Sequence, residues 1–134
     1  MPARCLWSRR SCCSTQTPTA QEPTKGAGLV RLKSGNEQFV KDASAAVSLG
    51  APTREALAKG QHPFAMVLSC ADSRMPPEYI FNVGLGDLFV IRAAGEVIDR
   101  SVMASLEYGA EHLNIPLLIV MGHESCGARR LYGT

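Results

Sequence analysis

The sequence predicts an α/β fold, a parallel β-sheet core with flanking helices. Three short runs consist of large apolar and β-branched residues without polar alternation, and segments with helical patterning or turn residues separate them. These runs are residues 64–69, 88–91 and 117–121. Buried strands that alternate with helices form right-handed βαβ units, and the carboxyl ends of such strands are where ligands bind.

The composition fits one globular domain and argues against two classes of partner. The chain has 134 residues, of which 46% are hydrophobic, an ordinary value for a protein with a packed core. The formal net charge is +2 and no dense basic stripe is present, so no nucleic-acid partner is expected. No segment approaches the roughly 20 consecutive apolar residues that span a bilayer, so no membrane segment is expected.

Residues 1–27 are predicted to be a disordered leader or a targeting segment, and residues 28–134 to form the domain. The first 24 residues contain three arginines, several hydroxyl residues and no acid before Glu22, a composition typical of organelle transit peptides. A disordered or wrongly assigned start explains the same residues equally well. The compartment is therefore left open between the cytoplasm, the periplasm and an organelle.

Two helices are expected before the first strand. Apolar residues recur near helical spacing from residue 28 to about residue 41, which predicts an amphipathic helix. This helix either packs on its own core or lies across a second subunit. Pro52 offers a helix start and Gly60 an end, so a shorter helix is expected over about residues 54–59.

Two further helices are expected between the strands. Pro77 suits the first turn of a short helix that reaches about Asn82. The strongest helical pattern covers about residues 99–113, where either Asp99 or Ser101 is available as the N-cap. With these elements, each connection between neighbouring strands contains a helix or a helical turn, as a parallel sheet requires.

Metal-ligating side chains follow the first and third apolar runs, at the point where each strand ends. Cys70 follows the first run, and His123 and Cys126 follow the third. Two neighbouring strands would place these three side chains around one point. A lone buried cysteine is usually a core residue, but two cysteines and a histidine at two strand ends favour a metal. Two thiolates and one imidazole form a zinc site with one open position, the pattern of catalytic sites.

Asp72 and Arg74 are predicted to control the open position on the metal. Asp72 lies two residues after Cys70, so its carboxylate can either bind the metal or form a bidentate pair with Arg74. The first arrangement closes the site, and the second leaves room for water. A loop ion pair with little energetic value is the alternative.

The charge of the predicted site indicates how activity depends on pH. Two thiolates cancel the charge of Zn²⁺, so the site is formally neutral. Such a site should lower the pKa of a bound water less than a site with three histidines does. Activity is therefore expected to rise on the alkaline side.

The pattern Cys70-x-Asp72-x-Arg74 followed by His123-x-x-Cys126 resembles the β-class carbonic anhydrases, over about residues 32–128. The resemblance implies a β-carbonic anhydrase-like fold, incomplete at the C-terminus. It implies reversible hydration of carbon dioxide to bicarbonate and a proton by zinc-bound hydroxide. Zn²⁺ would be bound by the two cysteines and the histidine, with Asp72 as a further ligand when the Asp72–Arg74 switch is closed.

The resemblance also implies a substrate pocket and an oligomer. Gln61 would offer an amide hydrogen bond to carbon dioxide or bicarbonate, and Phe89 and Tyr108 would form the pocket wall. On the residues alone, Phe89 and Tyr108 are plain core residues. The family is built on a dimer with active sites near the subunit interface, so a homodimer or higher homo-oligomer is expected, with the helix near residues 28–41 as an arm on the neighbour.

Residues 128–134 depart from the family's pattern. Relatives continue after the second cysteine with small and apolar residues, whereas this sequence reads Ala-Arg-Arg-Leu-Tyr-Gly-Thr. A frameshift, an early stop or a gene fragment is expected to explain the difference, and a poorly stable chain of uncertain activity to result. Two alternatives to the carbonic anhydrase reaction are a zinc-binding fragment without catalysis and a hydrolase of carbonyl sulfide or carbon disulfide on the same fold.

Overall fold

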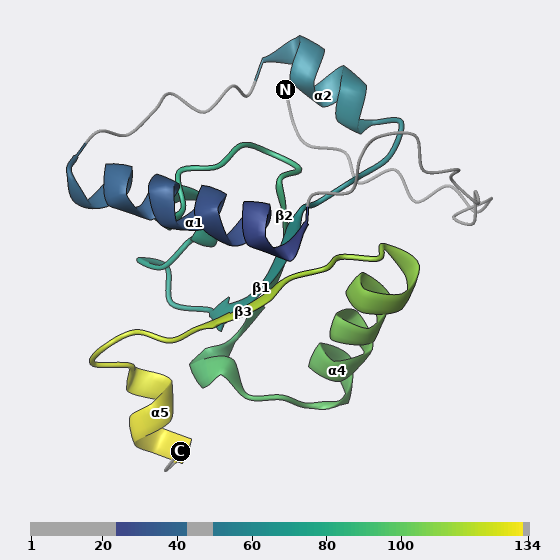
Figure 1. Ribbon diagram of the computed structural model, residues 1–134. Helices are drawn as coiled ribbons and strands as arrows, with labels where there is room; N and C mark the ends of the chain where they lie inside the picture. Colours follow the sequence, from purple (N-terminus) through teal and green to yellow (C-terminus); the bar gives the residue numbers. More distant parts are fainter. Residues whose placement is uncertain (1–23, 43–49, 133–134) are drawn as a thin grey trace.

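The computed structural model describes residues 24–42 and 50–132, in which three parallel strands form one sheet (Figure 1). Most of the predicted leader, residues 1–23, lies outside the described residues. The strands are β1 Ala65–Cys70, β2 Leu88–Ala93 and β3 Leu118–Met121. Their order is β2-β1-β3, so β1 is central, and all six of its residues are buried. This arrangement confirms the predicted parallel α/β fold.

The pairing register brings the carboxyl ends of the three strands to one edge of the sheet. Cys70, the last residue of β1, pairs with Ala93 of β2. Ser69 pairs with Met121, the last residue of β3. Because all three strands run in the same direction and end together, the residues that follow them lie near one another.

Helices and helical turns connect the strands and flank the sheet. In chain order they are α1 Lys25–Val40, α2 Ala51–Leu57, α3 Pro77–Ile80, the 3₁₀ turn η1 Ala94–Glu96, α4 Arg100–Glu107, the π-helical turn η2 Tyr108–His112, and α5 Gly127–Tyr132. The first two begin about three residues earlier than their sequence patterns predict. None of the helices in the described ranges combines the length and the apolar character that crossing a bilayer requires.

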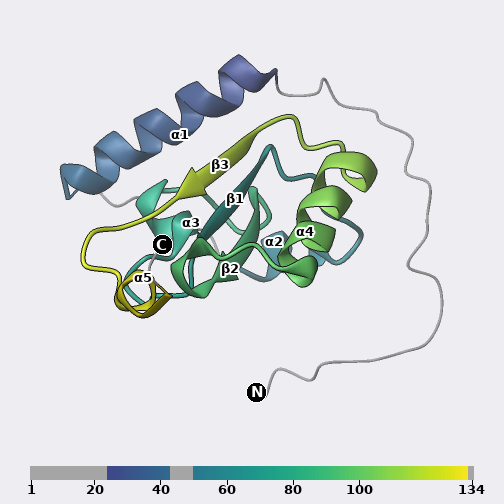
Figure 2. The same cartoon turned by 90° about the horizontal axis from the view of Figure 1, so that it is seen from below.

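Helices α1 and α4 pack on opposite faces of the sheet (Figure 2). Leu32 of α1 packs with Phe64 and Ala65. Leu68 of β1 points to the other face, as alternation along a strand requires, and packs there with Val102 of α4. The central strand is therefore covered on both faces, which explains its complete burial.

Helix α1 approaches the chain after α3 closely because residue 35 is glycine. A Cβ atom at Gly35 would lie 1.7 Å from the carbonyl oxygen of Phe81. Asn36, the next residue, donates a hydrogen bond from Nδ2 to the carbonyl of Ile80, at 3.2 Å. These contacts dock α1 on its own chain.

The helix predicted over residues 99–113 forms, but it changes type before its end. Asp99 is the N-cap of α4, and its Oδ1 accepts a hydrogen bond from the backbone N–H of Val102 at 2.8 Å. From Tyr108 the helix widens to the π type, and the N–H of Leu113 donates to the carbonyl of Tyr108. The wider turn sets Gly109 against β1, where a Cβ would lie 3.1 Å from Met66 Sδ.

Candidate metal centre

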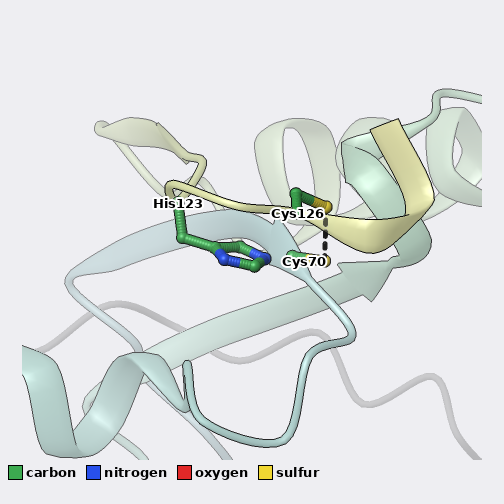
Figure 3. A group of neighbouring side chains, drawn as sticks. All are labelled: Cys70, His123 and Cys126. Carbon is green, nitrogen blue, oxygen red and sulfur yellow. Dashed lines mark hydrogen bonds between the residues drawn. The ribbon is translucent and has the colours of Figure 1, made fainter. Parts of the chain in front are cut away.

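Cys70, His123 and Cys126 converge at the carboxyl edge of the sheet (Figure 3). One ligand atom from each side chain lies within 4.8 Å of the other two. The sulfur atoms of Cys70 and Cys126 are 3.8 Å apart, and both thiols are free and buried. The parallel pairing of β1 with β3 joins these residues across 56 positions of sequence. The structure thus brings together the three side chains that the sequence assigns to a metal.

The imidazole of His123 has the hydrogen-bonding state of a metal ligand. Its Nδ1 lies 3.0 Å from the carbonyl oxygen of Glu124. A carbonyl oxygen can only accept a hydrogen bond, so Nδ1 carries the N–H that donates it. The lone pair then belongs to Nε2, which is buried without a hydrogen-bond partner among the described residues. Burying such an atom unpaired is unfavourable. An orphaned nitrogen beside two thiols fits a metal ion that prefers nitrogen and sulfur ligands.

The surroundings of Cys70 favour its thiolate form. The N–H of Gly95 donates to Cys70 Sγ at 3.4 Å. This hydrogen bond is the strongest of several interactions that, acting against burial, lower the pKa of Cys70 to about 7. Interaction with the Cys70 sulfur in turn raises the pKa of His123 above its ordinary value. Because the thiolate is the form that binds metals, Gly95 prepares Cys70 for that role.

Asp72 lies beside the three candidate ligands, where Arg74 holds its carboxylate at both oxygens. Nε and Nη2 of Arg74 donate to Oδ1 and Oδ2 at 2.9 and 2.7 Å. The backbone N–H of Arg74 also donates to Oδ1, at 2.9 Å. These bonds, the side-chain ones first, hold the pKa of Asp72 well below its usual range. Its Oδ2 is 3.8 Å from His123 Nε2, so the carboxylate borders the ligand group while paired to Arg74.

Arg92 organises the same loop, although the sequence analysis did not single it out. Its Nε donates to the carbonyl oxygen of Cys70 at 3.0 Å, and its Nη2 donates to the carbonyl of Asp72. One guanidinium therefore fixes the backbone on both sides of Ala71. The available signal was a charged residue at the end of the second apolar run, on the edge where the ligands gather.

The predicted pocket residues lie toward the other end of the sheet. Phe89 and Tyr108 are neighbours, with ring centroids 6.1 Å apart. Phe89 pairs with Met66, four residues before Cys70, which corresponds to about 13 Å along a strand. Gln61 is exposed and precedes β1. Within one chain, these three side chains stay apart from the metal-ligating group.

Comparisons with known proteins identify relatives of the chain. The family model for carbonic anhydrase matches residues 65–133. Carbonic anhydrase 2 of Mycobacterium tuberculosis is 52% identical over 97 residues, which are 72% of this chain and 47% of that protein. A carbonic anhydrase of Mycolicibacterium smegmatis is 47% identical over the same shares of both chains. The chain thus spans about half the length of the curated relatives it matches.

Solved structures of β-class carbonic anhydrases share the fold. The Coccomyxa enzyme in complex with acetazolamide superposes with a TM-score of 0.59 and 31% identity, over 79% of this chain and 48% of that one. The tetrameric enzymes of Sordaria macrospora give a TM-score of 0.59 and 27% identity, over 81% of this chain and 55% of that one. Together with the family match and the parallel sheet, these likenesses show that the chain belongs to the β-class carbonic anhydrase family.

Proposed function

We propose that the chain catalyses the reversible hydration of carbon dioxide to bicarbonate and a proton, with Zn²⁺ held by Cys70, His123 and Cys126. The observation that carries the proposal is the convergence of these ligand atoms within 4.8 Å at the end of the sheet. Two thiolates and one imidazole suit zinc and leave a position for water. When bound there, zinc would act as a Lewis acid and lower the pKa of that water.

In this proposal Asp72 and Arg74 regulate access to the open position. While Arg74 binds both carboxylate oxygens, Asp72 is held as an anion at the border of the site, and the position is left to water. When Arg74 releases the carboxylate, Asp72 can occupy the open metal position itself, because its Oδ2 is already 3.8 Å from His123 Nε2. The bidentate geometry favours the open state.

We further propose that a second copy of the chain completes the substrate pocket, so that the working unit is a homodimer or a higher homo-oligomer. Gln61, Phe89 and Tyr108 would then wall the pocket beside the other copy's metal. Support comes from the separation of about 13 Å along the strand between Phe89 and the metal-ligating edge of its own chain. The Sordaria macrospora relatives are described as tetrameric, which is consistent with this assembly.

The reaction is tested by measuring zinc content and carbon dioxide hydration on the full chain. The unaltered chain is expected to retain zinc and to hydrate carbon dioxide, whereas Cys70→Ser and His123→Ala lose both. A chain that holds zinc without turnover would instead be a zinc-binding fragment. Turnover of carbonyl sulfide or carbon disulfide alone would identify the hydrolase. Either result contradicts the proposed reaction.

The shared pocket is tested by complementation. Cys70→Ala removes a metal ligand, and a second variant, Gln61→Ala with Tyr108→Ala, removes pocket residues from the other end of the sheet. Each variant alone is expected to be inactive, while a co-expressed mixture regains activity in the mixed dimers. A mixture as inactive as its components would show that each chain builds its pocket alone.

A further inference from the structure

We infer that Glu96 and Arg129 form a clamp that positions the metal-binding loop, residues 122–129, against the turn that hydrogen-bonds Cys70. The inference deepens the proposed function, because it rests on the metal site formed by Cys70, His123 and Cys126. Neither clamp residue belongs to the group of converging ligand atoms. Both are positioning residues, which act on the metal through the backbone that carries its ligands.

Glu96 occupies an energetically unfavourable position in the fold. Its side chain is only 5% exposed, and neither carboxylate oxygen has a hydrogen-bond partner in the described part of the chain. Its backbone is also left-handed, with φ of 55°, which is unfavourable for a residue with a side chain. Buried charge without hydrogen bonds and a strained backbone both lower the stability of a fold. Their coincidence beside a functional site points to a role other than core packing.

The carboxylate of Glu96 faces both ends of the metal-binding loop. At one end, a Cβ atom placed on Gly122 would lie 3.8 Å from Glu96 Oε2, so the carboxylate faces the backbone just before His123 with room for about one methyl group between them. At the other end, Arg129 Nε lies 3.4 Å from the same oxygen, three residues after Cys126. One side chain thus lies near the loop before His123 and forms an ion pair with it after Cys126.

The neighbouring residue, Gly95, connects this contact to the remaining ligand. Its N–H donates to Cys70 Sγ, and a Cβ placed on it would lie 3.4 Å from Ala128 Cβ and 3.5 Å from Arg129 Cγ. The turn η1 therefore lies close to α5, and among the described elements α5 packs mainly against this turn. The dipeptide Gly95–Glu96 reaches the surroundings of all three ligands.

The ion pair restrains α5, which packing alone holds only weakly. Helix α5 has six residues, too few to be stable by itself, and Arg130 and Leu131 on it are exposed. The Glu96 side chain is 5% exposed and the Arg129 side chain 54% exposed, so the ion pair is partly shielded from water. Their attraction is therefore stronger than that of a pair fully exposed to water. Removing either charge frees α5 and with it Cys126.

The test compares Glu96→Gln, Arg129→Gln and the double variant with two matched controls. Glu107→Gln removes a negative charge from the exposed surface of α4, away from the site, and Arg130→Gln removes a positive charge from α5; neither residue forms an ion pair within the described ranges. Zinc affinity is measured by competition with a chromophoric chelator. Absorption of the cobalt-substituted chain reports the thiolate geometry, and urea unfolding of the metal-free chain reports stability.

Each clamp variant is expected to bind zinc about 10-fold to 100-fold more weakly, the usual effect of losing a residue that orients metal ligands. Both single variants should shift the cobalt–thiolate absorption, and the double variant should lose less affinity than the two singles combined. Arg129→Lys, which keeps the charge, should retain most of the affinity. Glu96→Gln should not lower the stability of the metal-free chain, since it removes a buried charge that lacks hydrogen bonds.

Three results would overturn the inference. The first is zinc affinity and cobalt absorption of both single variants equal to those of the unaltered chain. The second is equal weakening in the controls, and the third is weaker binding that merely follows a loss of stability in Glu96→Gln. If the unaltered chain itself binds neither zinc nor cobalt, the proposed function fails and the inference with it, so the two failures are distinguishable. Should Glu96→Gln not fold, Arg129→Gln at its half-exposed position provides the same comparison.

Discussion

The 3.8 Å between the sulfur atoms of Cys70 and Cys126 can be bridged in two chemically different ways. A metal ion lies between the thiolates and keeps them apart, whereas an oxidant joins them in a disulfide. Cys70, with its pKa lowered to about 7, provides thiolate near neutral pH. The metal-free site is therefore a reactive pair of thiols, and this reactivity can be measured without reference to catalysis.

We expect the chelator-treated chain to form a Cys70–Cys126 disulfide when diamide is added, and the zinc-loaded chain to resist it. A variant in which Cys5, Cys12 and Cys13 are serine removes competing thiols. The measurement is peptide mapping by mass spectrometry, which detects the cross-linked peptides. Recovery of both cysteines as alkylated thiols after diamide treatment would show that the metal-free site does not keep the sulfur atoms close.

A second expectation at this scale concerns how the contribution of Asp72 to folding stability depends on pH. Because Arg74 lowers the folded-state pKa of Asp72, the pair stabilises the fold above about pH 3.9, the ordinary value of an Asp, and this contribution disappears as the pH falls below it. Asp72→Asn should therefore destabilise the metal-free chain at neutral pH, and the difference should shrink in acid. Urea unfolding at several pH values measures this. Glu55→Gln, an exposed carboxylate of α2, is the control, and a pH-independent difference for Asp72→Asn would contradict the expectation.

Residue types at strand ends were enough to predict which three side chains converge, but not the residues that position them. Cysteine and histidine are recognisable as possible metal ligands in any sequence, so Cys70, His123 and Cys126 could be found from their positions at the ends of apolar runs. Arg92 and Gly95 act on the site through backbone groups and through cross-strand register. The charge of Arg92 at the end of the second apolar run was a signal in the sequence, but the backbone groups that Arg92 and Gly95 contact are known only from the structure.

At the scale of elements, continuous apolar runs predicted all three strands and their parallel arrangement correctly. The elements that the sequence did not predict depend on tertiary contacts. Helix α5 is short and polar, and it is docked on η1, so no periodic pattern marks it. The π-helical turn η2 arises where Gly109 meets β1, a contact that no local pattern records. Local pattern determines element type, whereas docking determines where elements end.

The docking of α1 gives a prediction with an internal control in the same helix. Gly35→Ala would place a Cβ 1.7 Å from the Phe81 carbonyl oxygen, so α1 must shift or detach, and we expect a loss of several kcal/mol of unfolding free energy. Gly26→Ala meets no atom within 4 Å and should gain up to about 1 kcal/mol from helix propensity. Urea unfolding of both variants checks this. Equal effects would mean that α1 does not pack on α3 in solution.

At the scale of the whole molecule, the sheet is covered unevenly. The side chains of Leu118 and Val120 on β3 are 43% and 63% exposed, although the neighbouring β1 is fully buried. Both point to the face on which α4 covers Leu68. The described chain thus presents apolar surface beside its best-packed strand, and such surface favours association.

We expect Val120→Lys to reduce concentration-dependent association of the chain without changing zinc content. The charge replaces an exposed apolar side chain outside the metal site, so folding and metal binding should be retained. Sedimentation velocity at rising concentration measures association. Val67→Lys, at a fully buried position of β1, is the contrasting variant and should not fold. Unchanged association of Val120→Lys would show that β3 is not the contact surface.

The pairing of β1 with β3 also sets the order of events in time. Cys70 leaves the ribosome 56 residues before Cys126, an interval of roughly 3–11 s at the usual rate of synthesis. Contacts between residues so far apart in sequence form slowly. During this interval Cys70 is a single thiol that cannot hold a metal with its partners. Binding of a metal by all three side chains would therefore follow the synthesis of Cys126 and the pairing of β3 with β1.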